Sequence, residues 1–523
     1  MPVRKICRSA VLQKTAVLLY FGLLLLPLTG FIRKEAYWGQ IPGAARRLKL
    51  AGNTFLLASL AALGCMAVGL AAAAWLHNGP LRRTRLRWFF LLLAPVPYYV
   101  YALTWMYLVR LLGRIDRNLM RSLSGGLLPC VFVNILSFLP LAVGVILVAM
   151  EYHDRKAEEM GSIYGGGNRV FFCIVLPAVF PAVMAAGALV FVLSAADFSV
   201  PSLFQYQTYT LEIFSEYSRT GNLGQTGLLA LPVILPVLGL FMLAHRGLGS
   251  IPIRRSSLEG RGLELSGVLR LAGGFAVVLC ILQIGVPLVL FFLQIRDPIQ
   301  LWESLGLCWE ELLLSIGIAM LSAGTAVLLA GPAAVWLEGK GWYWHLLALF
   351  PIAVPSSLIG MGILKTVNGS AFYGLSQTLY FPALGCAVKY MPFALLLFSA
   401  RHRRIHREEL EAGRIYRTSG PKYFRRILLP VYRPAVVSGA AVVFLLTLGE
   451  EGIPLILMPP GYETLAVKVY NYLHYGASEL VSGFCLITVL FTAGLFALVI
   501  RKTFQPEDRL STSVRKECRG EKR

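Results

Sequence analysis

One stretch of this sequence occurs twice, 253 residues apart and without a gap, and this repeat constrains the fold more than any other feature. Residues 158–201 align with residues 411–454, and fourteen of the 44 aligned positions are identical. The identities fall largely on glycines, prolines and other residues that begin, bend or end helices, namely Glu158/Glu411, Gly167/Gly420, Phe171/Phe424, Leu176/Leu429, Pro177/Pro430, Pro181/Pro434 and Pro201/Pro454. Each copy is a polar segment followed by a long apolar one. Self-similarity at such a period predicts a fold of two equivalent halves.

The composition of the chain is that of a membrane protein. Hydrophobic residues make up 57% of its 523 residues and charged residues 15%, whereas a soluble protein has about 25% charged residues. The net charge of +22 comes largely from Lys and Arg in short loops between apolar runs. This placement is typical of cytoplasmic loops retained by the positive-inside rule and argues against nucleic-acid binding. The sequence predicts an all-α, polytopic protein of the cytoplasmic (inner) membrane.

About twelve apolar segments are long enough to cross a bilayer. They lie near residues 11–31, 53–76, 88–109, 127–150, 174–196, 226–246, 266–295, 312–337, 343–365, 377–400, 431–449 and 481–500. The first segment follows several basic residues, as in a signal peptide, but no small-residue cleavage site follows Gly30. We therefore expect an uncleaved anchor.

The two copies of the repeat follow four and ten predicted spans, so both lie on the same side of the membrane and the halves are expected to be parallel. The expected organisation is a first transmembrane half (1–250), a cytoplasmic linker (251–265), a second transmembrane half (266–505) and a basic cytoplasmic tail (506–523). Both termini are then cytoplasmic. The basic loops 32–52 and 110–124 would face outwards, against the positive-inside rule, and short amphipathic helices on the membrane surface would account for them.

Motifs for enzymatic chemistry are absent from the sequence. The nine cysteines are scattered singly without a CxxC motif, and the seven histidines form no HExxH pattern. We therefore expect no catalytic residue, no metal site and no bound cofactor. No GxxxxGK[ST] motif occurs, so ATP binding would require a separate subunit.

The second copy of the repeat resembles a known motif. Glu411-Ala412-Gly413, followed by Gly420, Phe424 and Leu429-Pro430, is similar to the EAA loop of ABC importer permeases. In that family the loop forms a short cytoplasmic helix that docks into the ATP-hydrolysing subunit. Two such loops in one chain resemble the fused permeases for ferric iron, thiamine and aminophosphonate. The resemblance implies a type I permease fold whose partners are an ATP-binding cassette ATPase dimer, an extracytoplasmic solute-binding protein and the lipid bilayer.

The resemblance also implies which residues couple the chain to an ATPase. They are Glu158, Gly167, Phe171, Leu176 and Pro177 in the first copy, and Glu411, Ala412, Gly413, Arg417, Gly420, Phe424, Leu429 and Pro430 in the second. Both copies depart from the family pattern, which has a glycine six residues after the first Glu where this chain has Tyr164 and Arg417. The first copy departs further, so we expect it to couple more weakly. A basic loop attracted to anionic lipid is the alternative interpretation.

Each copy ends in an acid followed four residues later by proline. These residues are Asp197 and Pro201 in the first half, and Glu450 and Pro454, with Glu451 adjacent, in the second. Proline removes a backbone donor and clashes with the preceding turn, so each helix is expected to break there. In lipid, a break is tolerated where it faces protein or water. The mirrored breaks predict a gate or pathway between the halves, with a simple membrane boundary as the alternative.

Two functions are compatible with these features. The first is the permease subunit of an ATP-driven, binding-protein-dependent importer of a small solute. By resemblance alone, ferric iron is favoured, and thiamine or aminophosphonate are alternatives. The second is a self-contained, proton-coupled secondary transporter whose intramembrane acids carry the protons. The duplicated cytoplasmic loop favours the importer.

Overall fold

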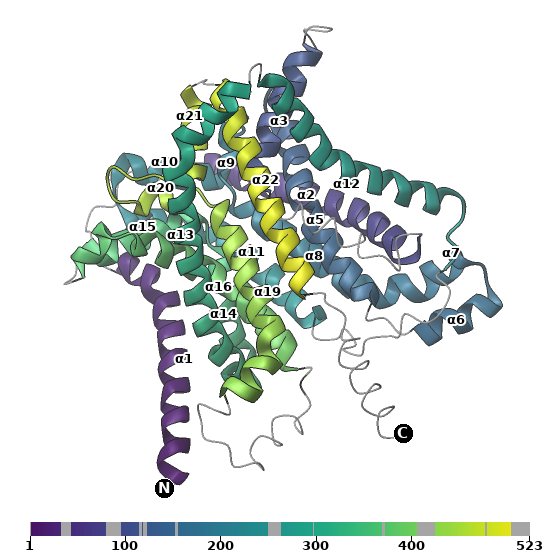
Figure 1. Ribbon diagram of the computed structural model, residues 1–523, viewed down its shortest axis with the longest axis horizontal. Coiled ribbons are helices and arrows are strands. Elements are labelled where there is room, and N and C mark those ends of the chain that lie inside the picture. Colours follow the sequence, from purple (N-terminus) through teal and green to yellow (C-terminus); the bar gives the residue numbers. More distant parts are fainter. Residues whose placement is uncertain are drawn as a thin grey trace, which may run out of the picture.

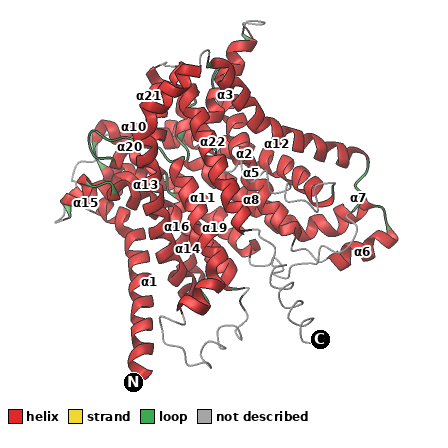
Figure 2. Ribbon diagram, in the orientation of Figure 1, coloured by secondary structure: helices red, strands yellow, loops and turns green. Residues whose placement is uncertain are grey.

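The computed structural model shows a bundle of α-helices (Figures 1 and 2). It describes residues 2–32, 43–79, 96–113, 118, 123–151, 155–248, 263–295, 298–368, 372–403, 405, 424–475 and 478–503. Helices and their connecting loops account for this part of the chain, and it contains no strand. The all-α prediction is therefore confirmed.

Among its described residues, the first half has six long helices and several short ones. The long helices are α1 (Pro2–Ile32), α2 (Ala44–Asn78), α3 (Tyr98–Leu112), α5 (Leu127–Glu151), α8 (Leu176–Ala196) and α11 (Leu223–Leu248). The short elements α6 (Arg155–Tyr164), α7 (Gly167–Val170) and η3 (Phe171–Val175) precede α8, and α9 (Ser199–Leu203) and α10 (Tyr209–Thr220) follow it.

The second half repeats this order. Its helices are α12 (Gly267–Gln294), α13 (Pro298–Leu337), α14 (Trp342–Ala353), α15 (Ser356–Asn368), η4 (Tyr373–Gln377), α16 (Tyr380–His402), η5 (Phe424–Leu428), α19 (Leu429–Leu448), α20 (Pro454–Leu457), α21 (Leu465–Tyr475) and α22 (Ser478–Thr503). The run η3–α8–α9–α10 thus corresponds to η5–α19–α20–α21, as the sequence repeat predicts.

Each of the twelve predicted apolar segments contains helix, although not all form a single long one. Among the described residues, nine helices are long and apolar enough to span a membrane, and a bent pair makes up to ten. That pair is α14 and α15, which meet at 101°. The segment 343–365 is therefore broken rather than straight, because Pro355 disfavours helix at Val354 and cannot donate to the preceding turn.

The helices pack in the same way within each half. Helices α2, α5 and α8 contact one another, and so do their counterparts α13, α16 and α19. The first helix of each half instead packs on the opposite half, since α1 lies against α13 and α15 while α12 lies against α2 (Figure 1). This exchange ties the two halves into one bundle.

Small residues allow the exchanged helices to approach closely. A Cβ atom added at Gly362 of α15 would lie 2.5 Å from the carbonyl oxygen of Pro27 in α1. The hydroxyls of Thr29 and Thr366 are 3.0 Å apart across the same interface. Close backbone approach with polar contacts is how helices associate in lipid, where burial of apolar surface gives little driving force.

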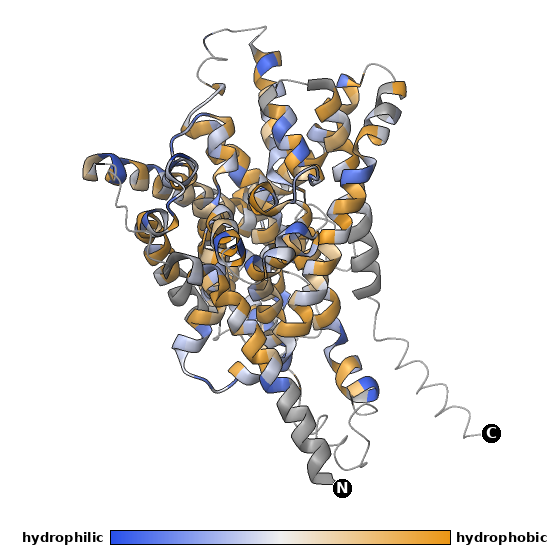
Figure 3. Cartoon of the chain, turned by 90° about the vertical axis from the view of Figure 1, so that its left-hand side faces the viewer, coloured by the Kyte–Doolittle hydropathy of each residue, from blue (hydrophilic) through white to orange (hydrophobic). Residues whose placement is uncertain are grey.

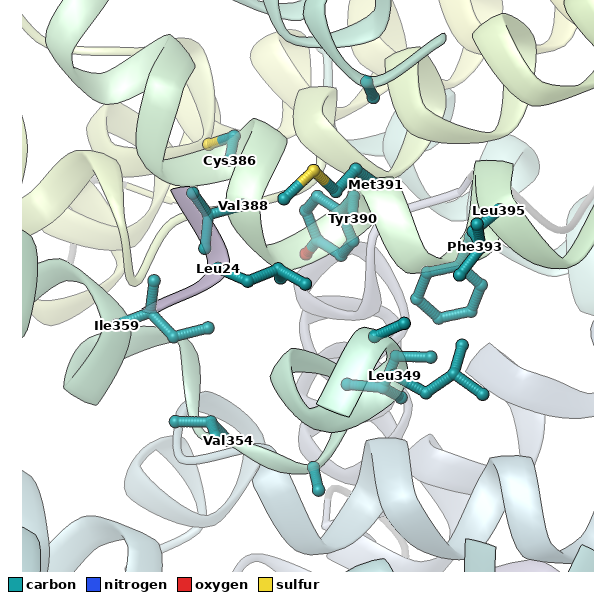
Figure 4. Packing of buried hydrophobic residues seen from close by; sticks show 14 of the residues in the cluster. Leu24, Leu349, Val354, Ile359, Cys386, Val388, Tyr390, Met391, Phe393 and Leu395 are labelled. Carbon is teal, nitrogen blue, oxygen red and sulfur yellow. The ribbon is translucent and has the colours of Figure 1, made fainter. Parts of the chain in front are cut away.

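The largest apolar cluster spans both halves. It contains Leu24 of α1 with Leu349, Ile359, Val388 and Met391 of the second half (Figure 4). Many large apolar side chains point outwards instead, for example Leu18, Val268, Leu271 and Leu328. Apolar residues recur along whole helices in Figure 3. An outer surface of this kind suits contact with lipid rather than water.

Candidate translocation site and coupling surface

The predicted helix breaks occur in both halves at equivalent positions. Helix α8 ends at Ala196, Asp197 is extended (φ −79°, ψ 133°), and α9 follows. Helix α19 ends at Leu448, and α20 begins at Pro454. The acids lie four residues before Pro201 and Pro454, where a proline ring would clash with the carbonyl of an unbroken helix.

The acid at each break caps the short helix that follows it. The Asp197 carboxylate accepts from the backbone N–H groups of Ser199 (3.0 Å) and Val200 (3.3 Å). Glu450 Oε1 accepts from the backbone N–H of Ile453 at 3.1 Å. First-turn N–H groups lack partners within their own helix, so a carboxylate at this position stabilises the helix start.

The fold brings the two breaks together at the interface of the halves. Glu450 also accepts hydrogen bonds from Ser356 (3.1 Å) and from the hydroxyl of Tyr390. Glu451 is near enough to interact electrostatically with both Glu450 and Asp197. The Tyr98 and Ser199 hydroxyls, which lie 3.2 Å apart, complete the surroundings. The carboxyl group of Asp197 from the first copy of the repeat and those of Glu450 and Glu451 from the second thus occupy one buried site.

The polar residues that surround these acids were not predicted from the sequence. Lys389 of α16 is buried and donates to the carbonyl of Val354 and to that of Ile352 at 3.4 Å. These carbonyls are left open where α14 breaks, so Lys389 caps that break and lies close to Glu450. A lysine inside a predicted span was the available signal, because such residues mark functional sites by default.

The acid site lacks the geometry of a resident metal centre. In the described residues, no three or more His, Cys, Asp or Glu side chains are arranged to hold a metal ion. His402 at the end of α16 pairs with Glu338 and with the hydroxyl of Tyr432. In the part of the chain that the structure describes, the acid site is therefore a buried polar region between the two halves.

The first copy of the repeated loop forms a compact surface element ahead of α8. Within it, Glu158 is buried, Phe171 is 1% exposed and packs in the core of the first half, Leu176 is half-buried, and Pro177 is exposed in the first turn of α8. The exposed apolar residues are instead Met160, Ile163 and Tyr164, which the sequence analysis did not select. Their spacing of three and four residues places them on one face of α6.

A short segment of the linker holds this loop in place. The side-chain amide of Asn168 donates to the carbonyl of Ser266 (3.0 Å) and accepts from its N–H (2.9 Å). The backbone of Glu264 passes so close to Gly167 that an added Cβ atom would lie 2.3 Å from its carbonyl oxygen. This close approach therefore requires glycine at position 167. We call these contacts of Gly167 and Asn168 with residues 264–266 the clamp, and α12 begins directly after it.

Most of the second loop lies outside the described residues, including Glu411, Ala412, Gly413, Arg417 and Gly420. Where the description resumes, Phe424 is 56% exposed, although its counterpart Phe171 is buried. Leu429 and Pro430 are exposed at the start of α19. The equivalent phenylalanines of the two copies therefore differ, since one is part of the core and the other is exposed.

Comparisons with known proteins agree with this architecture. Residues 326–507 match the family described as "Binding-protein-dependent transport system inner membrane component". The Fe(3+)-transport system permease protein FbpB 2 of Haemophilus influenzae is 24% identical over 70% of this chain and 74% of its own length. The spermidine/putrescine permease PotC of Escherichia coli is 28% identical over 21% of this chain and 40% of its own.

A third relative is the putative 2-aminoethylphosphonate permease PhnV of Salmonella paratyphi A, 27% identical over 28% of this chain and 55% of its own. No solved structure matches the chain. The all-helical fold with its apolar spans and these matches support the assignment of the chain as a binding-protein-dependent permease of the membrane. Its relatives are transport components rather than enzymes.

Proposed function

We propose that the chain is the membrane subunit of an ATP-driven importer and that its cargo is a cation, with ferric iron favoured. The observation that carries the cation is the meeting of Asp197, Glu450 and Glu451 in one buried site between the halves. Buried carboxylates favour a positive charge and oppose an anion such as a phosphonate. A relative named as a ferric-iron permease aligns with most of the chain.

The partners are an ATPase pair on the cytoplasmic side and an extracytoplasmic binding protein. The loop face of Met160, Ile163 and Tyr164 supports the first of these, since Tyr164 is 86% exposed and all three side chains are apolar or aromatic. In this arrangement the termini and both loops face the cytoplasm, and 251–265 links the two permease halves, 1–250 and 266–505.

Coupling follows from helix continuity. Element η3 continues directly into α8, and Asp197 stands at the far end of α8. Element η5 continues in the same way into α19, which leads to Glu450. A movement of either loop is therefore delivered along about 30 Å of helix to the acid site. The two short helices α9 and α20, capped by these acids, are the parts that such a movement would reorient.

The test is uptake of radiolabelled ferric iron by cells that express the chain with its ATPase and binding protein. Uptake should stop when ATP is depleted and continue when the proton gradient is collapsed, because ATP hydrolysis supplies the energy. Uptake that follows the proton gradient instead would identify the alternative, a secondary transporter.

The coupling surface is tested in the same cells with the double variant Ile163→Ser/Tyr164→Ser. Uptake and co-purification of the ATPase should both fall, while membrane insertion stays normal. Leu18→Ser, which changes an equally exposed side chain on α1, is the matched control and should leave ATPase co-purification unchanged. Full ATPase retention in the double variant would remove this face from the mechanism.

A further inference from the structure

Of the three acids in the buried site, two occupy equivalent positions of the repeat and the third has no acidic counterpart. Asp197 and Glu450 occupy equivalent positions of the two copies, whereas the position equivalent to Glu451 holds Phe198. The ring of Phe198 lies against Gly452, where an added Cβ atom would be 2.9 Å away from it. One half therefore contributes an apolar ring to this interface, and the other contributes a charge.

The equivalent pair is fully used in holding the fold together. Both Asp197 and Glu450 cap a following helix, and Glu450 additionally accepts from Ser356 and Tyr390. The positive charge of Lys389 also serves this pair, because it lies near Glu450 while its ammonium group donates to the carbonyls of α14.

Glu451 is the acid that the fold leaves without a positively charged partner, since among the described residues only neutral hydroxyls, those of Ser199 and Tyr98, are close enough to donate to its carboxylate. Its side chain is 1% exposed, and neither carboxylate oxygen has a hydrogen bond of normal geometry. The hydroxyls of Tyr98, Ser199 and Tyr470 lie around it, contributed by both halves. A buried carboxylate without a cationic partner is costly, so its persistence points to a ligand that supplies the missing positive charge.

We propose that Glu451 is the cargo-binding residue of the permease and that it takes a hard, oxygen-seeking cation in transit, while Asp197 and Glu450 position the helices around it. Carboxylate and hydroxyl oxygens are the groups that such cations prefer. A single carboxylate among neutral oxygens binds a cation weakly enough to release it again, which is what a transit site requires. This inference rests on the proposed cation import and names the residue that selects the cargo.

The binding test uses the purified full-length chain in detergent micelles and terbium(III) as a hard trivalent probe. Bound terbium emits light when energy passes to it from nearby tyrosines, and Tyr98 and Tyr470 both lie beside Glu451. Glu451→Gln should weaken terbium binding by about tenfold, since it removes a charge-assisted contact. Glu451→Asp should retain most of the binding.

Two further variants serve as controls. Glu463→Gln removes a carboxylate that accepts from Asn471 at 3.2 Å and is not among the groups that interact with Glu451, so this variant should bind terbium like the unaltered chain. Glu450→Gln should lower the free energy of unfolding. Its terbium affinity should stay closer to that of the unaltered chain than the affinity of Glu451→Gln does. Unchanged emission in Glu451→Gln, or an equal loss of terbium affinity in folded Glu450→Gln, would overturn the assignment.

Ferric-iron uptake separates this inference from the proposed function. If the unaltered chain imports ferric iron and Glu451→Gln imports it at the same rate, the assignment of Glu451 fails while the importer stands. If the unaltered chain imports no ferric iron but loses terbium binding on Glu451→Gln, the favoured cargo is wrong and the cation site stands.

Discussion

At the scale of single residues, two adjacent glutamates have opposite environments. Glu450 accepts hydrogen bonds from one backbone amide and two hydroxyls. The buried Glu451 accepts none of normal geometry and has only the hydroxyls of Ser199 and Tyr98 nearby. A satisfied buried carboxylate contributes to stability, and an unsatisfied one reduces it. The same chemical group therefore acts as a structural cap at one position and as a candidate binding group at the next.

This difference predicts the stability of two isosteric variants. Glu450→Gln should lower the free energy of unfolding by about 2 kcal/mol, because it weakens charge-assisted bonds. Glu451→Gln should leave the free energy of unfolding unchanged or raise it, because it removes an uncompensated buried charge. Thermal unfolding in detergent micelles gives the comparison, with Glu463→Gln as the control. A larger loss in Glu451→Gln than in Glu450→Gln would contradict the assignment of the cap.

At the scale of elements, the first copy of the repeated loop depends on contacts from outside the repeat. Its glycine run ends α6 at Tyr164 and lets α7 begin at Gly167, where the linker backbone passes. The paired hydrogen bonds of Asn168 with Ser266 then fix the loop to the start of α12. Since α12 packs on α2 of the first half, the linker joins the loop and the bundle into one unit.

Hydrogen exchange tests this clamp. Asn168→Ala should speed exchange at the Ser266 amide about tenfold, since it removes hydrogen bonds worth about 1 kcal/mol each. The readout is exchange of the peptide that spans residues 263–266, followed by mass spectrometry. Ser162→Ala, which loses one local bond to the carbonyl of Glu159, should leave this peptide unchanged. Equal protection in Asn168→Ala would mean that other contacts, among them the hydrogen bond from the Leu263 N–H to Asn78, hold the segment.

At the scale of the whole molecule, the two halves are joined by exchange of their first helices. Helix α1 leaves its own half to contact α13 and α15, and α12 does the same toward α2. The acid site lies between the halves, so any relative movement of the halves changes its geometry. The exchange restrains that movement, and the short helices follow their own half, since α9 packs on α3 and α5 while α20 packs on α15 and α16.

A cysteine pair at Thr29 and Thr366 reports the exchange directly. Their hydroxyl oxygens are 3.0 Å apart, so Thr29→Cys/Thr366→Cys should form a disulfide on mild oxidation, given that bonded sulfurs need about 2 Å. A protease site inserted in 251–262 then allows the halves to be separated. On a non-reducing gel the cut halves should stay linked. Thr29→Cys/Thr325→Cys is the control, and its cut halves should separate. If the cut halves of both variants separate, α1 does not lie against α15.

The sequence by itself determined the all-helical membrane class, the two equivalent halves and the position of both helix breaks. These properties depend on local causes that a sequence displays directly. They are the length of apolar runs, the period of the repeat and the backbone restrictions of Pro201 and Pro454. The class of permease was also accessible, because the loop motif of the second copy is short and contiguous.

Tertiary structure alone decided which groups meet. The repeat makes Asp197 and Glu450 equivalent, but the contact of Glu451 with Tyr98 and Ser199 depends on how the two halves face each other. The break between α14 and α15, its cap by Lys389 and the exposed face of α6 likewise depend on long-range packing. Local periodicity places a side chain on one face of a helix. Which residue it contacts there depends on how distant helices pack, and the same spans could pack in many arrangements.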